Sequence, residues 1–172
     1  DKFMTPMGTD IFSILGIRNI STWLKSWVDR YQVGLELSER NSPGSLSRFN
    51  IDSNDSLPIT KGYVGYTIQQ YITKSKGGVR RPTRAYEEII KNVPTEVENS
   101  LSEYLSLGMN HTNLQLGDVP HLYSLIPLAQ SVSAPLFELK SSDGIVGSQG
   151  KQYEVIIGGI CANLIENITL GR

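Results

Sequence analysis

The chain has 172 residues, of which 39% are hydrophobic, with a net charge of -1. This length and hydrophobic content suit a globular domain with its own core, and the balanced charge excludes overall electrostatic attraction to nucleic acid or membrane. A single cysteine, Cys161, excludes an internal disulfide and favours a cytoplasmic location. No apolar run is long enough to predict a transmembrane segment.

The chain enters its first predicted strand almost at once, at Phe3–Met7. We therefore expect a piece of a longer protein or a processed product. Thr9 or Asp10 can cap a following helix whose apolar residues recur at helical spacing through Val28. Trp23 and Trp27 lie four residues apart on this helix, so we expect them in the core, with a partner interface as the alternative.

The middle of the chain alternates between loops, a strand and helices. Residues 38–58 are polar and rich in Ser, Asn, Gly and Pro, which predicts a surface loop. A buried strand is predicted over 59–68. The following predicted elements are a Lys/Arg/Gly loop at 74–81, helices at 83–92 and 95–107, and a loop at 109–119.

The last third contains a predicted short helix at 120–132, a strand at Leu136–Leu139 and a final helix at 148–168. Cys161 falls on the apolar face of this helix, which predicts an inert core position. Strands alternating with helices predict an α/β fold, with a mainly parallel sheet flanked by helices. Residues 1–172 are expected to form one such domain or the C-terminal part of one.

A basic cluster, defined as Lys74, Lys76, Arg80, Arg81 and Arg84, contains five cations within eleven residues. It is either a solvated surface loop or a contact for DNA or another anion. Within this cluster, Lys76-Gly-Gly-Val79 is similar to the opening of a phosphate-binding loop. Pro82 follows where such a loop needs a backbone N–H group, which proline lacks. The residue pattern therefore favours a basic surface loop.

Other groups with chemical potential are scattered. The carboxylates of Asp10, Asp118, Glu138 and Asp143 have no nucleophile or base at a telling spacing, so no catalytic residues are predicted. His111 and His121 lie ten residues apart without a cysteine nearby, so no metal site is predicted.

Several segments, in order, carry a family resemblance. They are Pro6–Gly16, Gly62–Gln70, Arg81–Tyr86, Ser124–Gln130, Ala134–Leu139 and Ser142–Ser148. Together they resemble the C-terminal portion of ParA/MinD-type ATPases with a deviant phosphate loop. The phosphate loop and the Mg²⁺-binding acidic strand of that family have no counterpart in these 172 residues.

The resemblance implies an incomplete P-loop NTPase-like layer. The complete protein would bind ATP and Mg²⁺, form a dimer, and act in ATP-dependent partition or positioning of DNA or cellular cargo. This chain alone would hold no cofactor and would not hydrolyse ATP, because the electrostatic groups that stabilise phosphoryl transfer are missing. Its partner would be the missing N-terminal half or a homodimer partner, with non-specific DNA as a further partner.

By resemblance, the base side of the nucleotide would be contacted by Gln69, Gln70, Ile126, Pro127 and Leu128. Pro6 and Asp10 would lie on the switch and dimer face. Two alternatives remain open: a non-catalytic module that binds DNA or another polyanion through the basic cluster, and a protein-interaction module that uses the Trp23 and Trp27 face.

Overall fold

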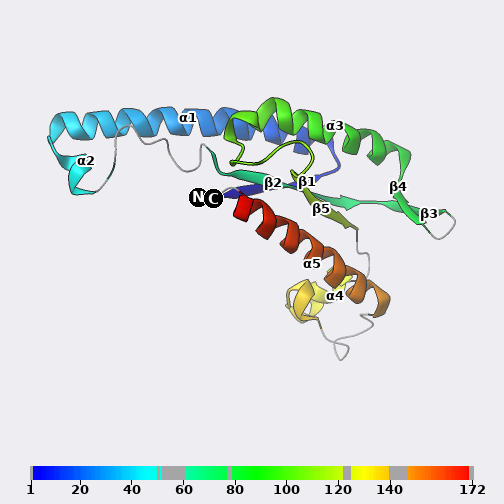
Figure 1. Ribbon diagram of the computed structural model, residues 1–172. Coiled ribbons are helices and arrows are strands. Elements are labelled where there is room, and N and C mark those ends of the chain that lie inside the picture. Colours follow the sequence, from blue (N-terminus) through cyan, green and yellow to red (C-terminus); the bar gives the residue numbers. More distant parts are fainter. Residues whose placement is uncertain are drawn as a thin grey trace.

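A computed structural model describes residues 2–49, 51, 61–76, 79–121, 125–139 and 147–170. Its centre is a sheet of three parallel strands in the order β1 (Phe3–Gly8), β2 (Tyr63–Tyr71) and β5 (Gln115–Pro120). Helices α1 (Ile11–Asn41) and α3 (Arg84–Leu101) cover one face, and α5 (Gly147–Leu170) crosses the other (Figure 1). The predicted α/β class, with a parallel sheet between helices, is confirmed.

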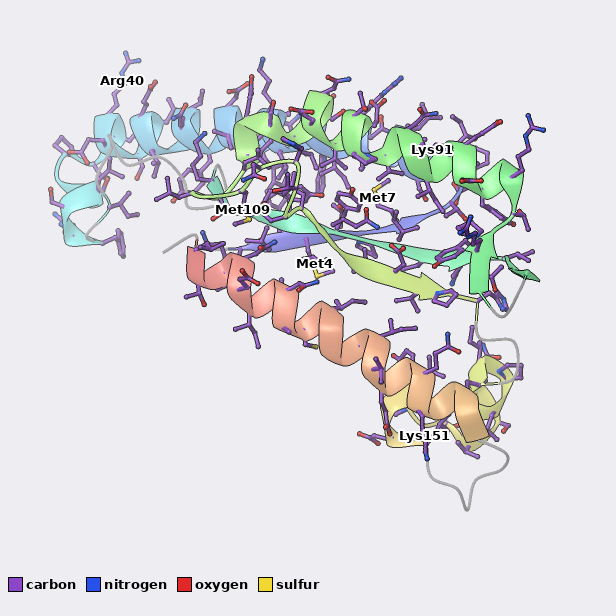
Figure 2. All side chains as sticks on the ribbon, turned by 45° about the vertical axis from the view of Figure 1, so that its right-hand side comes forward. Met4, Met7, Arg40, Lys91, Met109 and Lys151 are labelled. Atoms are coloured by element: carbon purple, nitrogen blue, oxygen red, sulfur yellow. The ribbon has the colours of Figure 1, made fainter. Side chains whose placement is uncertain are left out.

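Strand β1 and helix α1 form as the sequence predicts. Met7 is buried between the sheet and the α1/α3 layer, whereas Met4 lies toward α5 (Figure 2). The Asp10 side chain caps α1 by accepting a hydrogen bond from the Ser13 backbone N–H at 2.8 Å. Helix α1 then buries Ile14, Ile17 and Leu24 against the core.

Helix α1 continues to Asn41, into the segment 38–58 predicted to be a loop, and a short helix α2 (Ser45–Arg48) follows. The loop prediction is wrong for these helical residues. Glu39 stabilises the turn between the helices, because its carboxylate accepts from the backbone N–H groups of Gly44 at 2.6 Å and Leu46 at 3.0 Å. Residues 50 and 52–58 of the same segment lie outside the described residues.

Strand β2 is the centre of the core, and its residues from Tyr63 to Thr67 are all buried. The Tyr63 hydroxyl is 2.8 Å from the Thr5 hydroxyl on β1, so both buried polar groups are satisfied. Gly65 has φ +137, and a Cβ at this position would lie 2.4 Å from the Leu114 carbonyl oxygen. Only glycine permits this close approach to the chain beside it.

Helix α3 replaces the two helices predicted at 83–92 and 95–107. It runs unbroken through Pro94, with Val93, Val97 and Leu101 buried on one stripe. This continuous burial offsets the cost of an internal proline, which is about 3 kcal/mol. Thr95 is consequently a helix-interior residue and not the predicted cap, and a 3₁₀ turn (Ser102–Tyr104) ends the helical segment.

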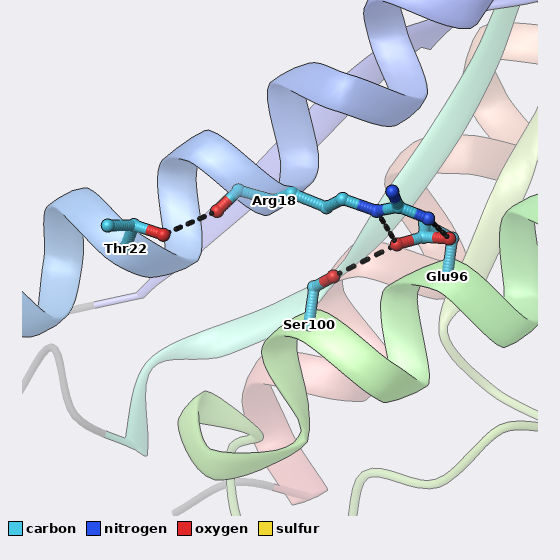
Figure 3. Close-up of polar contacts among 4 residues, drawn as sticks. All are labelled: Arg18, Thr22, Glu96 and Ser100. Atoms are coloured by element: carbon cyan, nitrogen blue, oxygen red, sulfur yellow. Dashed lines mark hydrogen bonds and ion pairs between the residues drawn. The ribbon is translucent and has the colours of Figure 1, made fainter.

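A bidentate ion pair joins the two helices on this face. Arg18 of α1 donates from Nη2 to Oε2 of Glu96 on α3 at 2.8 Å, and from Nε to Oε1, which also accepts from the Ser100 hydroxyl (Figure 3). The hydrogen bond from Arg18 lowers the pKa of Glu96. The pair therefore fixes α1 against α3 at one point outside the apolar core.

Three further predictions are wrong. The 74–81 segment is a hairpin of β3 (Thr73–Lys76) and β4 (Val79–Pro82), and the 109–119 segment contains strand β5. The predicted strand at Leu136–Leu139 is instead a 3₁₀ turn, Leu136–Glu138. The short helix predicted over 120–132 begins at Leu125, as α4 (Leu125–Val132).

Helix α5 confirms the predicted final helix and packs on the sheet through two asparagines one turn apart. Asn163 Nδ2 donates to the Leu116 carbonyl at 2.9 Å, and Asn167 Nδ2 donates to the carbonyls of Val64 at 2.8 Å and Asn113 at 2.7 Å. Cys161 is exposed on this helix, so its predicted core position is wrong.

Candidate functional site at the carboxyl edge of the sheet

The three parallel strands end side by side and form one edge. Gly8 of β1 is opposite Gln69 of β2, and Gln69 is opposite Val119 of β5. In open parallel sheets, ligands bind outside the carboxyl ends of the strands. This edge is the candidate site, since it also carries Gln69 and Gln70 of the predicted set.

The β1 end of the edge is a tight hydrogen-bonded turn into α1. The Gly8 N–H donates to the Ser13 hydroxyl at 3.0 Å, and Ser13 in turn donates from its backbone N–H and its hydroxyl to the Asp10 carboxylate. A Cβ at Gly8 would lie 2.5 Å from Asp10 Oδ2. Asp10 therefore acts as a helix cap, and its predicted role at a dimer face stays a prediction.

Pro6 is exposed on β1, which is an edge strand. The Phe3 N–H donates inward to Gly62, so by alternation the nitrogen of Pro6 faces the outer side of the strand. A proline is tolerated at this position because no hydrogen bond within the three-stranded sheet is lost. Its predicted contact with a nucleotide or a partner remains a prediction.

Gln69 and Gln70 differ in their backbone and their exposure. Gln69 is half-buried, and its Nε2 donates to the Thr67 hydroxyl at 3.1 Å. Gln70 is exposed with φ +61, at the register shift between Gln69 and Tyr71 on the β5 side. A left-handed non-glycine residue costs about 1–2 kcal/mol, and such strain clusters at binding sites.

Asp118 is a charged residue of this edge that the sequence analysis left without a role. It lies on β5 opposite Ile68 of β2, and its Oδ1 accepts from Gln115 Nε2 at 2.7 Å. Burial raises the pKa of Asp118 above its ordinary value. Burial, together with the negative charge of Asp118, raises the pKa of Tyr66 to about 12 and also raises the pKa of Tyr71.

The signal for Asp118 was weak in the sequence, because a lone aspartate after a Leu-Gly pair fits a loop as well as a strand. The carboxylate becomes notable only when β5 pairs with β2. Chemically, the edge offers the amide of Gln69 and the carboxylate of Asp118, which suit hydrogen bonding to a polar ligand. The hydroxyl–carboxylate pair described at this edge, Ser13 Oγ to Asp10 Oδ2 at 3.2 Å, serves the cap of α1.

Ile126, Pro127 and Leu128 lie on helix α4, whereas the resemblance places them on a loop. Ile126 and Leu128 are half-buried and Pro127 is exposed. Helix α4 lies beside the N-terminal half of α5, on the α5 side of the sheet and toward the carboxyl ends of the strands (Figure 1). The three residues thus share a side of the molecule with the edge, and their contact with a base stays a prediction.

The basic cluster continues directly from the carboxyl end of β2. In the β3–β4 hairpin, Lys74 is paired with Arg81, and Lys76 is paired with Val79. The Thr83 N–H donates to the Ile72 carbonyl at 3.1 Å, which joins the hairpin base to the start of α3. The backbone of the hairpin therefore lies next to the carboxyl end of β2, which carries Gln69.

Within the basic cluster, the structure describes the side chains of Arg81 and Arg84, and both are exposed. The Arg84 side chain is 94% exposed and lies 3.8 Å from the Glu88 carboxylate, a weak ion pair within α3. The side chains of Lys74, Lys76 and Arg80 lie outside the described residues. Both described guanidinium groups are accessible to an anionic ligand.

Trp23 and Trp27 are exposed on α1 and are not in the core. Their side chains are 60% and 54% exposed, and their rings stack with centroids 4.9 Å apart. The core prediction for this pair is wrong, because α1 buries the side that carries Ile17 and Leu24. The exposed aromatic face fits the alternative of a partner interface.

Two further tests concern metals and membranes. Among the described residues, no group of three or more His, Cys, Asp and Glu side chains is placed to hold a metal ion.

In the described part of the chain, one helix, Gly150–Leu170 within α5, is long and apolar enough to cross a membrane. A single helix of this kind is weak evidence, and the expectation of no transmembrane segment stays a prediction.

Comparisons with protein-family models, curated proteins and solved structures gave no match to this chain.

Proposed function

We propose that this chain is the C-terminal part of a ParA/MinD-type ATPase, an incomplete P-loop NTPase-like layer that supplies the base side of a nucleotide site. The complete protein would use ATP and Mg²⁺ to position DNA or cellular cargo. The observation that carries the proposal is the alignment of the three strand ends, with Gly8, Gln69 and Val119 at one level. Parallel sheets bind nucleotides at such an edge.

Residues of the edge suit an adenine ring better than a phosphate. Gln69 has a carbonyl acceptor and two amide N–H donors, one of which is directed to the Thr67 hydroxyl. The other donor and the carbonyl match the acceptor and the donor on the Watson–Crick edge of adenine. Asp118 carries negative charge on β5 and would repel a phosphate group. The phosphate-binding groups must therefore come from residues outside this chain, and the chain alone should bind adenosine weakly and hydrolyse no ATP.

An NMR titration of the whole chain tests the base-side assignment. Adenosine at millimolar concentration should shift the backbone amides of Gln69 and Gln70, and ATP should give the same shifts. Inorganic pyrophosphate should leave these amides unchanged. The variant Gln69→Leu should reduce the shifts, whereas Gln32→Leu at an exposed position of α1, remote from the edge, serves as the control. Equal shifts with pyrophosphate and adenosine, or none with adenosine, would refute the assignment.

A second candidate function is polyanion binding by the basic cluster. The specific observation in its favour is the pairing of Lys74 with Arg81 across the hairpin, since like charges placed opposite one another destabilise a hairpin unless an anion lies between them. Residues 74–84 contain no aspartate or glutamate to neutralise them. DNA would bind here through phosphate contacts without sequence preference.

DNA retention as a function of salt tests this second function. Each phosphate contact that is lost should lower the slope of log K against log salt concentration by about 0.9 for duplex DNA. Replacing Arg80, Arg81 and Arg84 with glutamine should weaken retention strongly, whereas Arg40→Gln on the distant end of α1 should not. Equal retention by the triple variant and the control would remove the basic cluster from consideration.

A further inference from the structure

An exposed side of α1 carries an apolar stripe that is interrupted at its margin by Arg30. Its residues are Phe12, Gly16, Trp23, Trp27, Tyr31, Gly34 and Leu37, called here the α1 stripe. At 100° per residue, Gly16, Trp23, Trp27 and Gly34 lie within about 40° of one another around the helix axis. Helix α3 packs on another side of α1, where Arg18 reaches Glu96.

The two glycines of the stripe are not required by the packing of this chain. A Cβ added at Gly16 or at Gly34 would meet no atom within 4 Å. Glycine in a helix interior is destabilising relative to alanine, so an open glycine there has a cost without a local benefit. A close approach by a second helix would provide that benefit, as small residues do at helix–helix contacts.

The central four residues of the stripe are self-complementary in the antiparallel direction. When two copies of a helix pack antiparallel about a twofold axis, residues whose numbers have a constant sum lie level with each other. With the axis level with Lys25, Trp23 lies level with Trp27 of the second copy, and Gly16 with Gly34. The same axis serves both pairs, which is the arrangement that an isologous interface requires.

The charged residues of α1 do not oppose this register. Arg40 and Asp10 lie about 120° from the centre of the stripe on opposite flanks of the helix, so they make no contact across the pair. Lys25 lies at the axis, but it is placed about 180° around α1 from the centre of the stripe. The two lysines of a pair are therefore kept apart by both helices.

The exposed area of the stripe approaches that of the smallest stable interfaces. Phe12, Trp23, Trp27 and Tyr31 are 79%, 60%, 54% and 44% exposed. Since an aromatic side chain buries roughly 150–250 Å², these four rings offer roughly 350–600 Å² per copy. Two copies reach roughly 700–1,200 Å², and Leu15, Val33 and Leu37 at the margins extend this toward the roughly 1,200 Å² of the smallest stable interfaces.

We propose that a second copy of this chain docks on the α1 stripe, with the two α1 helices antiparallel and Trp23 against Trp27 of the other copy. This interface is separate from the carboxyl edge of the sheet, so the proposal does not depend on the proposed function. Stacked tryptophans flanked by close glycine contacts would form its centre, as buried aromatic anchors do in other interfaces.

Sedimentation velocity over a concentration series tests the association. The chain should convert from monomer to dimer, and Trp27→Asp should weaken the dimer at least about tenfold. Val155→Asp is the matched control, because Val155 is an apolar residue of α5 that is 75% exposed and remote from the stripe. A chain that stays monomeric at all concentrations, or a control that weakens the dimer as much as Trp27→Asp, would overturn the proposal.

Cross-linking tests the register. In a Cys161→Ser background, the double variant Gly16→Cys/Gly34→Cys should form a covalent dimer with a short bismaleimide, since packed helix axes lie about 8–10 Å apart. Each single variant should not, because two copies of one position would be roughly 27 Å apart along the antiparallel pair. Cross-linking by a single variant at the rate of the double variant would contradict the antiparallel register.

Discussion

Replacing Asn167 with leucine probes how α5 is held on the sheet. Asn167 is 3% exposed, and its amide nitrogen donates to the carbonyls of Val64 and Asn113. Val64 lies at the register shift where β2 has one residue more than β1, and its carbonyl accepts from the Asn167 amide. The Asn167 amide satisfies this carbonyl and joins two segments of the sheet layer at once.

The leucine variant leaves both carbonyls without this donor. A buried polar group without a partner costs about 1–3 kcal/mol, so the free energy of unfolding should fall by roughly 2–4 kcal/mol. For a chain of this size, that corresponds to a decrease in Tm of roughly 4–16 °C. Urea unfolding followed by circular dichroism measures the change directly.

Two matched variants on α5 make the result interpretable. Asn163→Leu removes a single hydrogen bond, to Leu116, and should cost less than Asn167→Leu. Glu166→Leu, at an exposed position, should change the free energy of unfolding little. If Asn167→Leu proves no more destabilising than Glu166→Leu, α5 is not anchored as described. A gain in membrane association on removing this amide would instead favour a spanning helix.

Three further predictions concern the core and its electrostatics. Thr5→Val should lower the free energy of unfolding by about 1–3 kcal/mol by leaving the Tyr63 hydroxyl without a partner, and Thr5→Ser should restore most of it. Arg18→Gln should destabilise the protein at pH 7 but not at pH 3. Arg18 lowers the pKa of Glu96 in the folded protein, so the ion pair stabilises the fold above the pKa that Glu96 has in the unfolded chain, and this stability is lost as the pH falls. Asp118→Asn should stabilise the protein at pH 7, since the raised pKa of Asp118 means that its charge opposes folding, and this gain should vanish below about pH 4. Equal effects at both pH values would contradict the last two, as measured by urea unfolding.

Local signals in the sequence were sufficient for some elements. The strand at Phe3–Met7, the cap at Asp10 and the final helix were predicted because each depends on nearby residues: an apolar run, an N-cap side chain and a periodic apolar face. Strand β5 was missed because Gly117, Asp118 and Pro120 have low strand propensity. It exists through pairing with β2, about fifty residues earlier in the chain.

Two further errors concern helix faces whose burial depends on distant residues. Pro94 predicts a helix boundary, but Val93 and Val97 are buried on the same stripe and keep α3 continuous. Trp23 and Trp27 have the spacing of a core face, yet periodicity identifies a face without saying what covers it. The position of Gly8 and Gln69 at one edge can be predicted from a parallel sheet alone. The position of Asp118 beside Tyr66 cannot, because it depends on the register of β5 against β2.

The measurement closest to the central claim is a search for intermolecular nuclear Overhauser effects between adenosine and the whole chain. Our account predicts contacts from the adenine protons to the side-chain amide of Gln69 at the carboxyl edge. Contacts confined to the basic hairpin or to the α1 stripe, or the absence of any contact at saturating adenosine, would contradict it.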